Sequence, residues 1–319
     1  MIDFQKCAII GCGFVGSATA FSLVESGLFS EMVLLDANPD KAEGEAMDLS
    51  HGLPFAQPMR IYAGTYDDIA DCGLVVITAG ANQKPGETRL QLVKKNVSIL
   101  KSIIPQIKQR GYEGILLVVS NPVDILTYAA WKLSGFPAKR VIGSGTVLDT
   151  ARLKYLLGEH LGVDSRSVHA FIIGEHGDSE LAVWSSANIS GVDLADFCEL
   201  KGESSYREDL HSLYENVRDS AYQIIEKKGA TYYGIAMAVR RIAECIVRDE
   251  HGVLPISSFI NGHYGLNDIC MSIPAILDRD GVEQVLDIPL NAEELKNLTA
   301  SAAALQKVLD DIAPDLEVY

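Results

Sequence analysis

The sequence lacks any apolar run close to the roughly 18 residues that a transmembrane helix needs. It is also poor in positive charge, with 27 lysines and arginines against 43 aspartates and glutamates and a net charge of −16. The first absence argues against a membrane protein, and the second against nucleic acids and anionic membrane surfaces as partners. An anionic ligand would therefore have to be held by a few arginines that gather locally.

Paired or clustered cysteines are absent as well. The six cysteines are scattered over positions 7, 12, 72, 198, 245 and 270, with no C-x-x-C pair and no spacing typical of metal ligands. This pattern predicts reduced thiols in a cytoplasmic protein, and no metal site. A strand-like run begins a few residues after Met1, so we expect no signal peptide.

Hydrophobic residues, by contrast, make up 48% of the 319 residues, enough for a large core in one or two domains. In the first half, unbroken apolar runs alternate with amphipathic segments, which is typical of a parallel sheet covered on both faces. These runs are Cys7–Ile10, Met32–Asp36, Leu74–Thr78, Ile115–Val119 and Val141–Gly143, with a weaker one at Arg60–Ala63. A long helix over 90–110, with a possible bend at Pro105, belongs to the same pattern.

The texture changes after about residue 145. Helices are expected over 148–161, within 205–248 and over 291–312, and shorter strands over 168–173 and 253–261. We therefore predict an α/β protein with two parts. A doubly wound parallel sheet occupies residues 1–145, and an α+β substrate domain occupies residues 146–319.

Gly11, Gly13 and Gly16 form a G-x-G-x-x-G sequence between a predicted strand and a predicted helix. In this context the glycines allow a tight turn and the approach of a pyrophosphate to the helix N-terminus. Asp36 lies 20 residues beyond Gly16, at the end of the next strand, where a carboxylate would bind the adenosine ribose and repel a 2′-phosphate. The segment predicts a Rossmann domain that binds NAD, although the motif alone also fits a glycine-rich turn without a ligand.

His176 lies in Gly174-Glu175-His176-Gly177-Asp178, directly after an apolar run. A histidine in this setting is accessible, can be oriented and exchanges a proton near neutral pH. Asp149 and Arg152 lie three residues apart on a predicted helix and can face one side. Asp149 would accept the Nδ1–H of His176, and Arg152 would clamp a substrate carboxylate at two points. The alternative for Asp149 and Arg152 is a surface ion pair.

Two polar loops follow predicted strands, at the edge where open α/β sheets bind ligands. Residues 80–89 combine two glycines and a proline with a polar tip, which suits a lid that closes over a substrate. An ordinary surface loop has the same composition. Asn121 follows another strand and can point into the same crevice, but an Asx turn or a helix cap is equally compatible.

Taken in order, these stretches resemble the lactate/malate dehydrogenase family, and within it the bacterial L-lactate dehydrogenases. The resemblance runs nearly end to end and is carried by residues 11–16, 78–89, 120–124, 145–152, 172–180 and 228–234. It implies a cytoplasmic NAD-dependent enzyme that reduces pyruvate to L-lactate reversibly.

The resemblance also implies a role for each site residue. His176 would donate and accept the proton with Asp149 as its partner, and Arg89 would polarise the substrate carbonyl. Substrate binding is implied for Gln83, Arg89, Asn121, Arg152 and Thr231. Contacts to NAD are implied for Gly11, Gly13, Val15, Gly16, Asp36, Lys41, Tyr66, Gly80, Ala81, Asn121 and Ser144.

Substrate choice is expected to depend on Gln83. The malate dehydrogenases have arginine at the matching position, which pairs with the second carboxylate of oxaloacetate. Glutamine offers no countercharge, so oxaloacetate would bury an unpaired carboxylate at high cost. Pyruvate or another monocarboxylic 2-keto acid is therefore the expected substrate. Two alternatives stay open: a dehydrogenase of the L-2-hydroxyisocaproate type, and an inactive NAD-binding structural protein.

Regulation and assembly follow from the same resemblance. Many bacterial relatives are activated by fructose 1,6-bisphosphate, which binds an arginine and a histidine at a subunit interface. Here His169 occupies the histidine position, but Lys154 replaces the arginine, and lysine keeps the charge without the planar fork. Activation by fructose 1,6-bisphosphate is thus an open expectation. A homotetramer is implied, with a dimer as the alternative.

Overall fold

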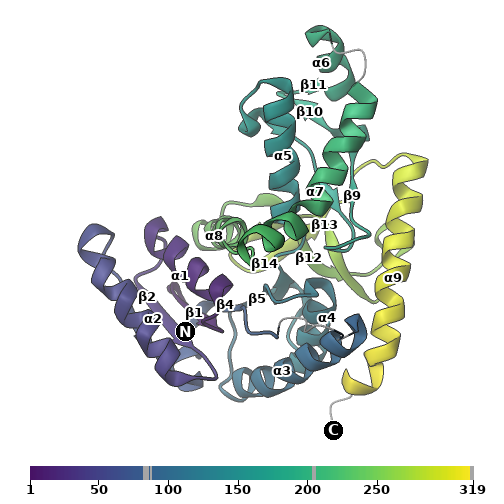
Figure 1. Cartoon of the computed structure of the whole chain (residues 1–319). Coiled ribbons are helices and arrows are strands. Elements are labelled where there is room, and N and C mark those ends of the chain that lie inside the picture. Colours follow the sequence, from purple (N-terminus) through teal and green to yellow (C-terminus); the bar gives the residue numbers. More distant parts are fainter. Residues whose placement is uncertain (82–85, 87, 203–205, 317–319) are drawn as a thin grey trace.

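The computed structural model describes residues 1–81, 86, 88–202 and 206–316 (Figure 1). Its centre is a nine-stranded sheet in the order β14-β13-β12-β6-β5-β4-β1-β2-β3. The parallel strands are β1 (Asp3–Ile10), β2 (Glu31–Leu35), β3 (Arg60–Ala63), β4 (Cys72–Ile77), β5 (Ile115–Val118) and β6 (Val141–Gly143). Their order is that of a dinucleotide-binding Rossmann sheet, which confirms the predicted fold class.

Four helices connect the parallel strands: α1 (Phe14–Ser26), α2 (Pro39–Gly52), α3 (Arg89–Gln109) and α4 (Val123–Ser134). The crossovers run in opposite directions from β1, so α1 and α2 cover one face and α3 and α4 the other. Helix α3 continues through Pro105. The sequence pattern did not indicate α4, because this helix is buried on nearly all sides and has no polar stripe.

The rest of the chain extends the sheet and builds a lobe on it. Helices α5 (Val147–Leu161), α6 (Leu194–Lys201) and α7 (Tyr206–Lys228) project from the sheet on the side away from α3 (Figure 1). Short strands accompany them: β7 (Val168–His169), β8 (Ile172–Ile173), β9 (Leu181–Ala182), β10 (Asn188–Ile189) and β11 (Val192–Asp193). The predicted strand 168–173 is thus two strands, interrupted at Ala170 and Phe171.

Three antiparallel strands continue the sheet beyond β6: β12 (Gly252–Ile260), β13 (Ile269–Asp278) and β14 (Gly281–Val285). The junction is the pairing of Ser257 with Gly143. Helix α8 (Tyr233–Arg248) packs on α1, and α9 (Ala292–Leu316) packs on α3 and α4. The main hydrophobic core therefore runs through both halves of the chain, and a second, smaller core lies inside the lobe.

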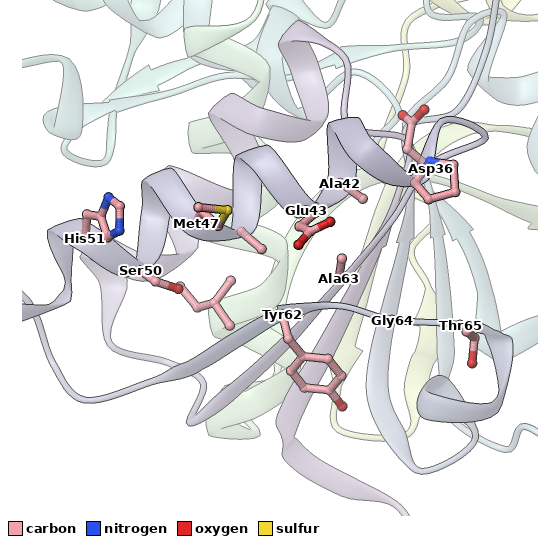
Figure 2. A pocket seen from close by; sticks show the side chains of 13 residues that line it. Asp36, Ala42, Glu43, Met47, Ser50, His51, Tyr62, Ala63, Gly64 and Thr65 are labelled. Carbon is pink, nitrogen blue, oxygen red and sulfur yellow. The ribbon is translucent and has the colours of Figure 1, made fainter.

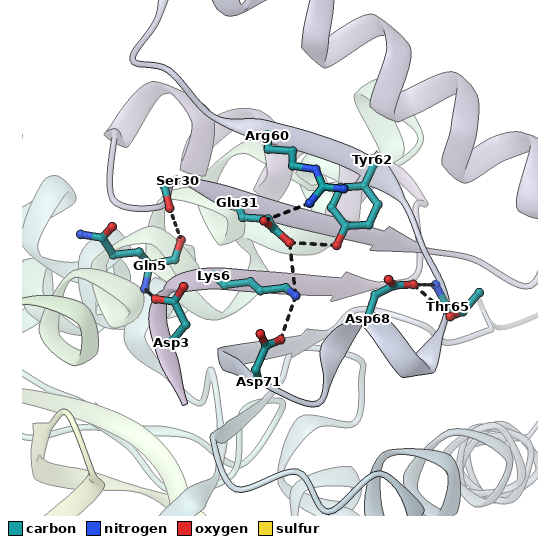
Figure 3. Close-up of polar contacts among 10 residues, drawn as sticks. All are labelled: Asp3, Gln5, Lys6, Ser30, Glu31, Arg60, Tyr62, Thr65, Asp68 and Asp71. Carbon is teal, nitrogen blue, oxygen red and sulfur yellow. Dashed lines mark hydrogen bonds and ion pairs between the residues drawn. The ribbon is translucent and has the colours of Figure 1, made fainter. Parts of the chain in front are cut away.

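A buried lysine lies near the amino ends of the central strands. Lys6, only 8% exposed, lies between Glu31 at 3.2 Å and Asp71 at 2.8 Å (Figure 3). Burial alone would lower the pKa of Lys6, but its two carboxylate partners outweigh burial and raise that pKa. Tyr62 donates a second hydrogen bond to Glu31, at 2.8 Å. This network lies at the amino ends of the strands, whereas the glycine loop after β1 lies at their carboxyl ends.

Within the described residues, no helix is long and apolar enough to cross a bilayer. All six cysteines are buried free thiols.

Candidate functional site

The glycine loop joins β1 to α1, and each of its glycines meets a different demand. Gly11 has a φ of +107°, and a Cβ there would lie 2.5 Å from the backbone nitrogen of Ala79. A Cβ on Gly16 would lie 1.9 Å from the oxygen of Gly11, so only glycine lets α1 approach the loop. A Cβ on Gly13 would meet nothing within 4 Å. The space next to Gly13, the N-cap of α1, is thus open to a ligand phosphate.

Asp36 is held rigidly beside this loop. One carboxylate oxygen accepts the N–H of Cys12 at 2.7 Å, and the other accepts the N–H of Asn38 at 2.9 Å. Asp36 lines a cavity of about 700 Å³ at the carboxyl ends of the strands. The same cavity brings together six of the predicted NAD-binding residues: Gly11, Gly13, Asp36, Lys41, Tyr66 and Gly80. Its volume and its carboxylate fit an adenosine ribose and pyrophosphate.

A second cavity adjoins the first. It lies between α2 and β3, with Asp36 at one end and His51 at the other (Figure 2). The carboxylate of Glu43 and the side chain of Met47 line it between these ends. Two carboxylates near the ribose position make this end of the site unfavourable for a 2′-phosphate, which agrees with NAD as the cofactor.

The other predicted cofactor residues surround the same strand ends. Val15 lies in the first turn of α1, and Ser144 is buried after β6, where its N–H donates to Val118 at 2.9 Å. Ala81 and Asn121 belong to two neighbouring loops that Asn96 joins. Its Oδ1 accepts the N–H of Ala81 at 2.7 Å, and its Nδ2 donates to the carbonyl of Asn121 at 2.8 Å. Sequence reasoning missed Asn96, which looks like any polar residue of an amphipathic helix.

The loop that carries His176 is fixed from several elements. Thr150 of α5 accepts the N–H of Ile172 at 2.9 Å, which places β8 against the first turn of α5. Gly174, with a φ of +97°, pairs with Ser272 of β13 through two backbone hydrogen bonds. The next N–H, of Glu175, donates to Ser301 of α9 at 2.9 Å. The loop therefore has little freedom before it reaches His176.

His176, Asp149 and Arg152 form one connected group. The Nδ1 of His176 lies 2.6 Å from Asp149 Oδ2, and Arg152 Nη1 lies 2.7 Å from Asp149 Oδ1. Burial opposes ionisation of Asp149, but the charges of His176 and Arg152 outweigh it and lower the pKa of that carboxyl. Burial likewise opposes the imidazolium, yet Asp149 raises the pKa of His176 to about 9. This arrangement holds His176 protonated at neutral pH, and its Nε2 has no hydrogen-bond partner among the described residues.

Asp124, in the first turn of α4, was not singled out from the sequence. Its carboxylate accepts the backbone N–H of His176 at 2.8 Å and contacts Ser272 Oγ at 3.4 Å. Burial raises the pKa of Asp124 to about 6, despite hydrogen bonds that favour its charged form. The residue lies three positions after Asn121, so α4 connects the Asn121 loop to His176. In the sequence, its position shortly after the Asn121-Pro122 pair could have marked Asp124 as a site residue.

Arg89 is placed next to the histidine loop. It is the first residue of α3, whose N-cap Thr88 forms a capping box with Gln91. Its guanidinium is hydrogen-bonded to the buried carboxylate of Glu175 and lies 3.7 Å from Asp178. About half of the Arg89 side chain is exposed. Arg89 is thus held at the rim of the site by the two acids that flank His176.

Of the four remaining predicted residues, three are described by the structure and the fourth is not. Thr231 precedes Tyr232, whose ring stacks on Phe14 of α1. Lys154 is half-buried on α5, where burial lowers its pKa, and His169 is exposed on β7, against which α5 packs. Gln83, with the polar tip of its loop, is not among the described residues.

A cavity at the glycine loop, together with a histidine oriented by a buried carboxylate and an arginine, is typical of an NAD-dependent oxidoreductase. Sequence comparison is more specific. The model of the lactate/malate dehydrogenase NAD-binding domain matches residues 5–143, and that of the lactate/malate dehydrogenase alpha/beta C-terminal domain matches residues 146–315. The chain belongs to the lactate/malate dehydrogenase family.

Relatives and solved structures agree with this assignment. An L-lactate dehydrogenase 1 of Clostridium acetobutylicum is 53% identical over 96% of this chain and 98% of its own length. An L-lactate dehydrogenase of Acetivibrio thermocellus is 53% identical over 96% of each chain. The crystal structure of a lactate dehydrogenase from a Medee basin deep-sea metagenome library is 51% identical and has a TM-score of 0.94, over 97% of this chain and 98% of that one. The predicted resemblance to bacterial L-lactate dehydrogenases and the predicted NAD-dependent enzyme class are confirmed.

Proposed function

We propose that the protein reduces pyruvate to L-lactate with NADH and catalyses the reverse reaction with NAD. The observation that carries this proposal is the group His176–Asp149–Arg152. It combines a protonated imidazole with an arginine that can bind a carboxylate, at the strand ends where the dinucleotide cavity opens. Names of the relatives support the same reaction, since eight L-lactate dehydrogenases match at 51–53% identity.

In the forward direction His176 donates its Nε2 proton to the keto oxygen. NADH, when bound, supplies the hydride that reduces the keto carbon. Asp149 fixes the Nδ1–H tautomer and stabilises the imidazolium before transfer. In the reverse direction neutral His176 accepts the hydroxyl proton of lactate. Pyruvate reduction should therefore fall, and lactate oxidation rise, as the pH increases through about 9, the pKa of His176.

Arg152 and Arg89 bind different oxygens of the substrate. Arg152 uses one N–H for Asp149 and keeps the others of its fork for the substrate carboxylate. Arg89 polarises the keto oxygen after the 80–89 loop closes, and for this step it must exchange Glu175 for the substrate. Asn121 and Thr231 complete the substrate site in this proposal.

Gln83 selects a monocarboxylic acid in this proposal, because it places no positive charge opposite a second carboxylate. NADH oxidation with pyruvate, oxaloacetate and 2-ketoisocaproate tests the assignment. We expect the highest kcat/KM with pyruvate. A preference for 2-ketoisocaproate would instead support the L-2-hydroxyisocaproate type, and no turnover with any of them would support an inactive NAD-binding protein.

The variant Gln83→Arg should raise the oxaloacetate-to-pyruvate ratio of kcat/KM by at least about tenfold, a difference of about 1.4 kcal/mol in transition-state binding. Gln83→Leu is the matched control, since it removes the amide without adding charge, and it should leave the ratio low. An unchanged ratio in Gln83→Arg contradicts the role of Gln83.

For regulation, we propose that fructose 1,6-bisphosphate binds Lys154 and His169. Its phosphates would find a half-buried ammonium on α5 and an imidazole on β7. Pyruvate saturation curves with and without the effector test this. Activation should strengthen in Lys154→Arg, which restores the planar fork, and disappear in His169→Ala. Identical curves with and without the effector, in the wild type and in Lys154→Arg, would contradict effector binding.

For assembly, we propose a homotetramer, in which residues 1–145 form the NAD-binding domain and residues 146–319 the substrate domain. Large apolar side chains are exposed on α2 and α8, among them Met47 at 55%, Tyr233 at 67% and Met237 at 61%. Exposed apolar patches of this kind are typical of subunit interfaces. Sedimentation velocity measures the mass directly, and a dimer or a monomer contradicts the proposal. A cytoplasmic location, which suits six reduced thiols, belongs to the same proposal.

A further inference from the structure

A second buried acid lies behind the catalytic histidine, and the mechanism above does not use it. Glu180 follows the His176 loop immediately before β9 and is 5% exposed. Its backbone is fixed on both sides. The N–H donates to the carbonyl of Gly177 at 3.2 Å, and the carbonyl accepts the hydroxyl of Tyr214 from α7. These bonds direct the side chain into the protein rather than toward solvent.

The carboxyl group of Glu180 points at the catalytic pair. A carboxyl oxygen lies within 4.8 Å of both a ring nitrogen of His176 and a carboxylate oxygen of Asp149. Yet Glu180 Oε1 is buried without a hydrogen-bond partner among the described residues. An ionised carboxylate in that position would be strongly disfavoured, since it would be desolvated, unpaired and close to a second anion.

Glu294 is a second buried glutamate, and its contacts are those expected of a structural role. It is also 5% exposed. Its carboxylate accepts the N–H and the hydroxyl of Ser185, at 2.9 and 2.5 Å, and the N–H of Asn291 at 2.9 Å. Glu180 is equally buried, but none of the described residues donates to its Oε1, so a capping role does not account for it.

The charges around Glu180 come from three elements and its own loop. They are Asp149 and Arg152 on α5, Tyr214 and Arg218 on α7, His176 on the loop, and Asp124 on α4 behind His176. Burial, and then the charge of Asp149, raise the pKa of Glu180 to about 9, against the opposing influence of His176 and the two arginines. The side chain is therefore a neutral acid at neutral pH.

We propose that Glu180 is a positioning residue that carries a proton beside the His176–Asp149 pair and sets the pH range over which His176 remains an imidazolium. This inference rests on the proposed acid–base role of His176. While Glu180 is protonated, Asp149 is the one anion bonded to the imidazolium within the described residues. When Glu180 loses its proton at alkaline pH, its new charge holds the proton on His176, so pyruvate reduction extends to higher pH than Asp149 alone would permit.

The test is Glu180→Gln in the full-length enzyme, because glutamine has the shape of the protonated acid but cannot ionise. The measurements are kcat/KM for pyruvate and for lactate over about pH 5 to 10, with deuterated NADH to verify that hydride transfer is rate-limiting. We expect the acid plateau of pyruvate reduction to stay within about twofold and its alkaline limb to shift about one pH unit lower. Lactate oxidation should gain several-fold at mildly alkaline pH, where the variant's His176 is already neutral.

Glu294→Gln is the matched control. It removes one acceptor from a satisfied buried glutamate, so it should lower the melting temperature and leave both pH profiles unchanged. An unmoved alkaline limb in Glu180→Gln, or a uniform loss of rate at every pH, would overturn the proposal.

Two further measurements keep the outcome interpretable. In wild-type enzyme, infrared spectra at a pH above about 7, where Asp124 is ionised, should still show the C=O stretch of a protonated buried carboxyl. Absence of that band would overturn the proposal even if Glu180→Gln does not fold.

His176→Asn distinguishes the acid–base role of His176 from the positioning role of Glu180. Full activity in His176→Asn would contradict the acid–base role. An inactive His176→Asn, together with an unchanged pH profile in Glu180→Gln, would contradict only the role of Glu180.

Discussion

The cofactor region and the catalytic region adjoin each other but are built differently. The cofactor region is a short, continuous piece of backbone in which the missing side chains of Gly11, Gly13 and Gly16 do most of the shaping. The catalytic region is a set of charged side chains, such as Asp149 and Asp124, brought to His176 by separate elements. The cofactor region depends on the absence of side chains, and the catalytic region depends on the positions of charged side chains.

This difference has a consequence for how each region fails. Adding a single carbon to the glycine loop changes binding of the dinucleotide at every pH, because the obstacle is steric. Removing a charge from the catalytic region changes a rate or a pH dependence while the fold survives. Substitutions in the two regions should therefore separate KM effects from kcat effects, and that separation can be measured.

The largest expected effect is in the catalytic region. His176→Asn removes the proposed proton donor but keeps a polar side chain, so kcat for pyruvate should fall by about 10²–10⁴-fold. The Kd for NADH, measured by fluorescence titration, should change by less than about twofold, since the glycine loop is untouched. His251→Asn is the control, because His251 also bonds a carboxylate, Glu283, through Nδ1 at 2.7 Å but lies in the exposed loop between α8 and β12. Comparable losses in both variants would contradict the catalytic role of His176.

Next in size is the cofactor region. In Gly16→Ala the new Cβ would lie 1.9 Å from the Gly11 oxygen, so the loop must shift, and we expect both NADH affinity and melting temperature to fall. Affinity should drop by roughly 100-fold, or about 2.7 kcal/mol. Gly13→Ala has open space around its Cβ, so it should weaken NADH binding by roughly tenfold with little change in melting temperature.

Gly44→Ala provides the control for both glycine variants. Gly44 lies on α2, its Cβ would also meet nothing within 4 Å, and it is outside the cavity residues. Alanine there should raise stability by up to about 1 kcal/mol, as expected for a helix interior, without changing NADH binding. If Gly13→Ala binds NADH as tightly as Gly44→Ala does, the open space at Gly13 does not receive the pyrophosphate.

The same contrast explains what could be predicted from the sequence. The cofactor region is local: glycine spacing, a preceding apolar strand and Asp36 at the right distance describe it almost completely. The six parallel strands were likewise predictable, because buried parallel strands are continuous apolar runs. His176, Asp149 and Arg152 were found because their neighbours are distinctive, and the structure brings them within hydrogen-bond distance.

The supporting residues could not be found in this way. Asn96, Asp124 and Glu180 act through contacts with residues 15 to 148 positions away, or through the lack of a contact. Apart from the Asn-Pro pair before Asp124, nothing in their local sequence separates them from polar residues on an ordinary helix or turn. The attachment of β12 to β6 was also hidden, because it depends on one long-range pairing between Ser257 and Gly143.

A smaller effect is expected at Asp124, where the measurable change is in stability rather than in rate. Its pKa in the folded protein is raised to about 6, above the value of about 3.9 in an unfolded chain. The carboxyl group therefore destabilises the fold progressively as the pH rises from about 4 to about 6. Asp124→Asn cannot ionise, so its stability relative to wild type should increase over that interval by up to about 3 kcal/mol. Urea unfolding at several pH values measures this difference.

Asp164→Asn is the control of opposite sign. Hydrogen bonds from Arg166 lower the pKa of Asp164 to about 2, so any advantage of the wild type there is present above about pH 4 and is lost on acidification. A relative stability of Asp124→Asn that does not change between about pH 4 and 6 would show that Asp124 is ionised without penalty. It would then be an ordinary acceptor for the His176 N–H.

The smallest effect is expected at the Lys6 network, at the amino ends of the strands. It tests whether the two functional regions, at the carboxyl ends, are independent of this network. Lys6→Met leaves Glu31 and Asp71 without their shared cation (Figure 3) and should cost about 1–3 kcal/mol. Because the pKa of folded Lys6 is raised, its contribution is complete below the ordinary lysine pKa of about 10.4 and is lost only above it. On the acid side, burial of Glu31 is outweighed by its hydrogen bonds and by the charges of Lys6 and Arg60, which lower its pKa, so the contribution is lost as the pH falls below the ordinary glutamate pKa of about 4.3. Lys139→Met, which breaks an exposed pair with Asp280, should cost about 0–1 kcal/mol.

Neither variant should alter kcat or the KM for NADH. A change in either constant for Lys6→Met would mean that the amino ends of the strands also control the geometry of the glycine loop.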